Sequence, residues 1–129
     1  MMDFLQGKWL KHPLHPALVH IPTALWPAAF VFDVLSQFQP DNAFVQLAFF
    51  AILMGFIVAL IAIPTGYADW TDIKPEKPAW KLGLYHMILN VIVSILWGIN
   101  LVLRLQGFQT DVSVPLGFVG LSAVAILLL

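Results

Sequence analysis

Residues 43–64 read AFVQLAFFAILMGFIVALIAIP, and Gln46 is the only strongly polar residue in this run. An α-helix rises about 1.5 Å per residue, so a run of this length is long enough to cross a hydrocarbon layer of about 30 Å. A helix that is apolar on every face is stable in a lipid bilayer, where it needs no polar surface toward water. The stretch therefore predicts a membrane-spanning helix.

The composition of the whole chain supports this prediction. Of the 129 residues, 60% are hydrophobic and 10% are charged, whereas an ordinary soluble domain has about 25% charged residues. The net charge is −1 and the charges are spread out, so no basic patch indicates a nucleic-acid partner. The absence of cysteine excludes disulfides, thiolate metal ligands and a cysteine nucleophile. We expect an integral membrane protein in contact with the lipid bilayer.

Three further apolar runs, approximately 16–38, 79–104 and 112–129, surround the first, and short polar segments connect them. They predict an all-α fold: one domain over residues 1–129, a bundle of four transmembrane helices running up, down, up and down. The predicted second span, 43–64, ends at Pro64 because Pro64 and Gly66 interrupt the pattern. The last run is still apolar at Leu129 and gives only about 22 Å of helix from Pro115, so we expect a truncated last helix.

The basic residues predict the orientation of the bundle. The N-terminal arm and the connection after the second span contain five lysines, whereas the segments on the other side contain only Arg104. The lysines are Lys8, Lys11, Lys74, Lys77 and Lys81. The positive-inside rule then places the N-terminus in the cytoplasm, if the membrane is a bacterial inner membrane.

The stretch His12 to Pro22, HPLHPALVHIP, contains three of the four histidines at the start of the first span. His20 and His86 of the third span lie at similar depths, roughly 6 to 10 Å inside their helix starts. Two imidazoles at one depth on different helices of a bundle suit axial ligation of a b-type haem. Asn90 lies one turn beyond His86 on the same face. We therefore expect a haem site of His20, His86 and Asn90, acting in electron transfer within or beside a membrane redox complex.

Two alternatives to haem remain open. One is a divalent-metal site at the cytoplasmic face, because imidazole and carboxylate groups are ligands for transition metals. Its candidate ligands are His12, His15, His20, His86, Asp69 and Asp72. The other is a protein without a cofactor, whose histidines are structural. Such a protein would be an accessory subunit of a larger membrane complex or a homo-oligomer.

Asp33 in the first span and Arg104 at the end of the third lie at comparable depth, so we expect them to form a structural ion pair. No pairing of a nucleophile with a base and no glycine-rich phosphate loop stands out in the sequence. We therefore expect no stand-alone enzymatic activity.

The block HPLHPALVHIP closely resembles the opening of a bacterial family of small four-helix membrane proteins of unknown function. The segments GYADW at 66–70 and HMILN at 86–90, followed by Arg104, are similar to later blocks of that family. The resemblance covers about residues 12–104. It implies a four-span membrane domain, sometimes found with Rieske-type or cytochrome partners, and no established activity. In the family a glycine-rich and histidine-containing segment is expected after the fourth span, and nothing here matches it.

Overall fold

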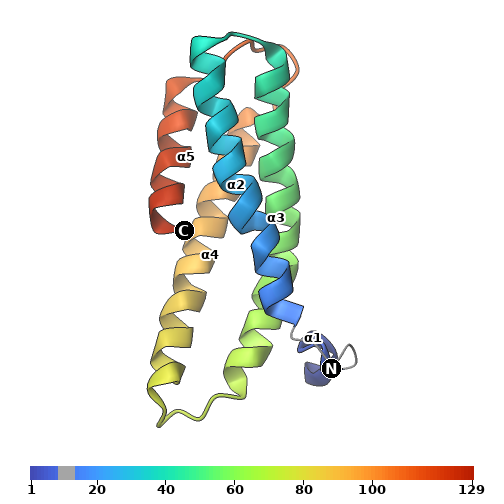
Figure 1. The fold of residues 1–129 in the computed structure, drawn as a ribbon, viewed down its shortest axis with the longest axis vertical. Coiled ribbons are helices and arrows are strands. Elements are labelled where there is room, and N and C mark those ends of the chain that lie inside the picture. Colours follow the sequence, from blue (N-terminus) through green and yellow to red (C-terminus); the bar gives the residue numbers. More distant parts are fainter. Residues whose placement is uncertain (9–13) are drawn as a thin grey trace.

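The structure of the protein is a computed structural model that describes residues 1–8 and 14–129. These residues form helices and no strand, as the sequence predicts. The helices are α1 (Met2–Leu5), α2 (Leu14–Phe38), α3 (Asn42–Thr71), α4 (Pro78–Arg104) and α5 (Leu116–Leu128), shown in Figure 1. The architecture is a helical bundle compatible with a membrane.

Three of these helices, α2, α3 and α4, are long and apolar enough to cross a membrane. α5 has 13 residues, which gives a helix of about 20 Å. It is short, as expected, but it begins at Leu116 and not near residue 112. Residues before Leu116 stay outside the helix because Val114 is bound at both of its backbone groups. Its N–H donates to the Ser36 hydroxyl at 3.0 Å, and its carbonyl accepts from the Gln37 side chain at 2.7 Å.

α3 continues through Pro64 to Thr71, so the predicted end of this helix at Pro64 is also wrong. Proline disrupts the helical ladder on its N-terminal side, but neighbouring side chains can bond the backbone there. In the turn around Pro64, the Ala62 carbonyl accepts from the Thr65 hydroxyl at 2.7 Å. α2 likewise continues through two prolines, Pro22 and Pro27.

Helices α2 to α5 each pack against the next helix in the sequence. α2 lies along α3, α3 packs on α4, and α5 contacts both α4 and α2. In Figure 1, α5 lies beside one half of the bundle, and the C-terminus is at mid-height. The core includes Trp26 of α2 stacked on Trp97 of α4, with ring centroids 5.5 Å apart. The candidate site lies in the half of the bundle beyond the C-terminal end of α5.

Candidate functional site

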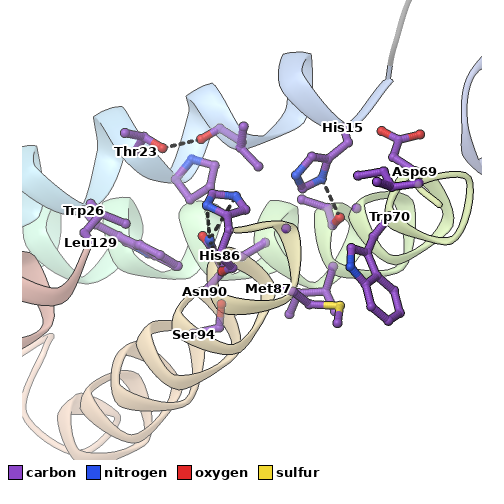
Figure 2. A pocket seen from close by; sticks show the side chains of 18 residues that line it. His15, Thr23, Trp26, Asp69, Trp70, His86, Met87, Asn90, Ser94 and Leu129 are labelled. Carbon is purple, nitrogen blue, oxygen red and sulfur yellow. Dashed lines mark hydrogen bonds between the residues drawn. The ribbon is translucent and has the colours of Figure 1, made fainter. Parts of the chain in front are cut away.

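A cavity of about 190 Å³ lies between α2, α3 and α4, and Leu129 contributes to its lining near the end of α5. Figure 2 shows its side chains. Much of the lining is apolar, and the tryptophans Trp26 and Trp70 form part of it. The polar side chains on its wall are His15, Thr23, Asp69, His86, Asn90 and Ser94. An apolar cavity with a few polar groups is the usual form of a ligand site.

His15, in the first turn of α2, is held against α3. Its Nδ1 lies 2.9 Å from the Ala62 carbonyl oxygen and 3.3 Å from the Thr65 hydroxyl. A carbonyl oxygen can only accept, so Nδ1 carries the proton and donates it to Ala62. In the neutral ring this tautomer leaves the lone pair on Nε2, where it is available to a ligand.

Gly66 provides the surface on which the His15 ring rests. A Cβ atom at position 66 would lie 2.6 Å from Cε1 of His15 and 2.8 Å from its Nδ1. Such distances are far below van der Waals contact, so any side chain larger than hydrogen would displace the ring. Gly66 therefore permits the close approach of α2 and α3 at this point.

His86 of α4 is the histidine that faces His15. The two ring centroids are 6.3 Å apart and the ring planes are at 87° to each other, as Figure 2 shows. The side-chain amide nitrogen of Asn90 lies 3.1 Å from Nε2 of His86 and donates to its backbone carbonyl at 2.8 Å. Asn90 therefore lies beside His86, and its role in binding a cofactor stays a prediction.

The structure does not bring His20 and His86 together, which corrects the expected pairing. His20 is exposed and does not line the cavity. With 3.6 residues per turn, His20 lies about 140° around α2 from His15. The cavity side of α2 contains His15, Val19, Pro22, Thr23 and Trp26. The helical spacing of those residues is the sequence signal that identifies His15 as the inward-facing histidine.

The proposed divalent-metal ligands are dispersed. Asp69 lines the cavity, whereas Asp72 accepts a hydrogen bond from Gln6 at 2.7 Å and lies 3.9 Å from the Lys8 ammonium. His12 lies outside the described residues. Over residues 1–8 and 14–129, no three His, Asp or Glu side chains are grouped closely enough to hold a metal ion. The described ligands therefore do not form a conventional multidentate site.

Asp33 and Arg104 form a buried, two-pronged ion pair in the other half of the bundle. The Arg104 Nη1 and Nη2 atoms donate to the two Asp33 carboxylate oxygens at 2.6 and 2.7 Å. Nε of Arg104 donates to Asn100 at 2.6 Å, and the Ser122 hydroxyl donates to Asp33 at 2.8 Å. All four side chains are buried. This network joins α2, α4 and α5, and it lies apart from the cavity that His15 lines.

Comparison with known proteins finds one family. A family model described as "Predicted membrane protein (DUF2231)" matches residues 11–129. No curated protein and no solved structure matches the chain. The family match agrees with the resemblance carried by the histidine block, and it extends through the last helix.

Proposed function

We propose, from the premise that this chain belongs to that family of predicted membrane proteins, that it binds a b-type haem between His15 and His86 and transfers electrons. When bound, the haem iron supplies a one-electron redox couple. The chain's own residues bind and orient the group, and the apolar helices keep the site within the membrane.

The observation that carries the proposal is the state of His15. A histidine that binds a metal usually donates its other ring N–H to a carbonyl or carboxylate, which fixes its tautomer and orientation. His15 has this arrangement in the protein alone, because its Nδ1 donates to the Ala62 carbonyl at 2.9 Å. Nε2 of His15 is thereby prepared as a ligand.

The separation of the two rings also suits a shared metal. An imidazole nitrogen binds a transition metal at about 2.0 Å, so two rings on one metal have centres roughly 6 Å apart. The His15 and His86 centroids are 6.3 Å apart. The two rings come from α2 and α4, which each pack on α3. This places the candidate ligands on two helices with a common support.

The volume of the cavity limits how far a haem would be enclosed. At about 190 Å³, the cavity exceeds the roughly 150 Å³ that holds a benzene molecule and is smaller than the roughly 300–1,000 Å³ of drug-sized pockets. A haem would therefore be only partly enclosed by this cavity. Ala59, Ala62 and Gly66 of α3 line the cavity with small side chains.

A reduced-minus-oxidised absorption spectrum of the purified protein tests this proposal. We expect Soret and α bands in the wild type, and their loss or marked weakening in His15→Ala and His86→Ala. His20→Ala is the matched control, because it removes an exposed histidine from the same helix as His15, and it should retain the bands. A wild type without haem bands, or equal loss in all three variants, overturns the proposal. Co-purification of a haem-free protein with a membrane complex would instead support an accessory subunit.

The same proposal includes the location. If the membrane is a bacterial inner membrane, the five lysines on one side and Arg104 on the other favour an N-terminus in the cytoplasm. In this orientation the cavity lies toward the cytoplasmic half of the membrane, because His15 and Asp69 are near the lysine-rich ends of α2 and α3. The haem would then accept or donate electrons with a partner in or beside the membrane.

A further inference from the structure

A second cavity, of about 310 Å³, lies at the end of the bundle opposite to His15 and His86, and we call it the connection cavity. The connection between α4 and α5 provides most of its lining, and the end of α4, the start of α5 and Val45 of α3 complete it. In Figure 1 this end of the bundle also contains the turn between α2 and α3. The volume is at the lower limit of small-molecule sites, which are roughly 300–1,000 Å³.

Asp111 provides a carboxylate without a counter-charge on the wall of the connection cavity. Within residues 1–8 and 14–129, its side chain takes part in no hydrogen bond or ion pair, although the residue is half-buried. Burial of a charged group is unfavourable unless a partner compensates for the lost hydration. A bound cation would supply this partner.

The backbone of the connection fixes the position of this carboxylate. The N–H of Asp111 donates to the Gly107 carbonyl at 2.8 Å, and the Asp111 carbonyl accepts from the Asn42 amide at 2.7 Å. The carboxylate rests on the bare Cα of Gly107, because a Cβ there would overlap Oδ2 of Asp111 and lie 2.8 Å from its Cγ. The carboxylate is therefore placed before any ligand arrives.

The charges at this end of the bundle favour a cation over an anion. Over residues 36–45 and 104–116 the charged side chains are Asp41, Arg104 and Asp111. Arg104 also lines the connection cavity, but its charge is matched by Asp33, which accepts from it at 2.6 and 2.7 Å. Carboxylates are therefore in excess here, and they attract a positively charged ligand.

The apolar part of the wall selects the kind of cation. Phe108 lines the cavity, and its ring is stacked on Phe49 of α3 with the centroids 4.0 Å apart. Phe118, Leu103 and Val45 add further apolar lining. Aromatic rings attract organic cations, and quaternary ammonium groups are recognised in this way. A hydrated metal ion would gain little from these side chains, whereas a cation with an apolar body would contact both kinds of wall.

We propose that the connection cavity binds a small organic cation, an amine or quaternary ammonium with an apolar body, through the Asp111 carboxylate and the phenylalanine rings. The binding is non-covalent. It does not depend on the proposed haem, because no described residue lines both cavities.

Titration of the purified protein with benzyltrimethylammonium tests this site. Amide chemical shifts in a non-ionic detergent should change saturably over residues 104–118 of the wild type. Asp111→Asn keeps the shape of the side chain and removes its charge, so we expect the affinity to fall at least about tenfold. Neopentylbenzene, in which carbon replaces the ammonium nitrogen, should bind more weakly than the cation and equally to both proteins. A wild type without saturable shifts in this segment, or equal affinity of the two proteins for the cation, overturns the proposal.

Asp41→Asn is the matched control for general attraction by negative charge. Asp41 lies at the same end of the bundle, accepts from the Ala43 N–H at 2.9 Å and does not line the cavity. Asparagine caps a helix as well as aspartate does, so this variant should keep the wild-type affinity for benzyltrimethylammonium. A loss equal to that in Asp111→Asn overturns the site in favour of surface attraction. Shifts produced by calcium chloride and not by the organic cation would also overturn it. The haem bands are a separate measurement, so their absence leaves this result unchanged.

Discussion

Arg104 donates hydrogen bonds to three other side chains inside the bundle, and its charge is matched by a single carboxylate, Asp33. Both partners are almost completely buried, at 3% and 0% side-chain exposure. Removing one member of such a pair leaves an uncompensated charge in an apolar medium, which is more costly than removing both members. The pair therefore constrains α2 and α4 strongly.

We predict that Asp33→Ala lowers the free energy of unfolding by about 3–5 kcal/mol, because Arg104 is left charged and unpaired. The midpoint of thermal or denaturant unfolding in detergent measures this change. The double variant Asp33→Leu with Arg104→Met should recover a large part of the loss. Asp3→Ala is the control, since its pair with Lys8 is exposed and should leave the midpoint unchanged. An Asp33→Ala protein as stable as the wild type would contradict the assigned role.

The sequence was sufficient to predict this ion pair but not the histidine pair, and the reason is physical. Asp33 and Arg104 are isolated charges in apolar runs, and each needs a partner. His15, in contrast, is close to the start of its helix, where depth alone makes it an interfacial residue. Its selection over His20 depends on the helical phase of α2 and on the bare backbone of Gly66, which belongs to another helix.

At the scale of elements, polar side chains at the α2–α3 turn bind the backbone of the connection between α4 and α5. The Asn42 amide donates to the carbonyl oxygens of Asp111 and Phe108 at 2.7 and 3.2 Å. The Gln37 amide donates to the carbonyl of Val114 at 2.7 Å. These bonds satisfy carbonyl groups in a segment that is not helical. They attach α5 to the first two long helices.

We predict that Asn42→Ala loosens this connection. The variant loses two hydrogen bonds to carbonyl groups, so stability should fall by about 1–2 kcal/mol, and amide hydrogen exchange should become faster over residues 105–115. Asn90→Ala is a suitable control, because Asn90 lies at the cavity and its hydrogen bonds are to His86, away from this segment. Unchanged exchange over 105–115 in Asn42→Ala would show that other contacts hold the connection.

Hydropathy predicted the existence and order of the long helices well, but it located their ends less well. α3 continues beyond Pro64, and close to this proline the Ala62 carbonyl accepts from the Thr65 hydroxyl and from Nδ1 of His15, a residue of another helix. The late start of α5 depends on Ser36 and Gln37, which bind Val114 from the other end of α2. His15, Ser36 and Gln37 are distant in sequence from the groups that they bind, so a local pattern does not contain these contacts.

At the scale of the whole molecule, the orientation in the membrane can be measured directly because the chain contains no cysteine. We predict that a cysteine introduced at Glu76 reacts with a membrane-impermeant thiol reagent only from the cytoplasmic side, since its connection carries the lysines. A cysteine at Thr110 should react only from the opposite side. Cysteine at Ile57, in the middle of α3, is the unreactive control. The reverse pattern of labelling would invert the assigned topology.

The short α5 gives the two halves of the bundle different mechanical properties. One half has the ion pair, the Ser122 and Asn100 hydrogen bonds and the contacts of α5, while the other half contains a cavity in place of a packed centre. We therefore expect the helices to be held together less firmly at the cavity than at the charged network. A sideways displacement of α4 would be largest at His86 and smallest at Arg104, so the bundle converts a small tilt of one helix into a change in the distance between its two facing imidazoles.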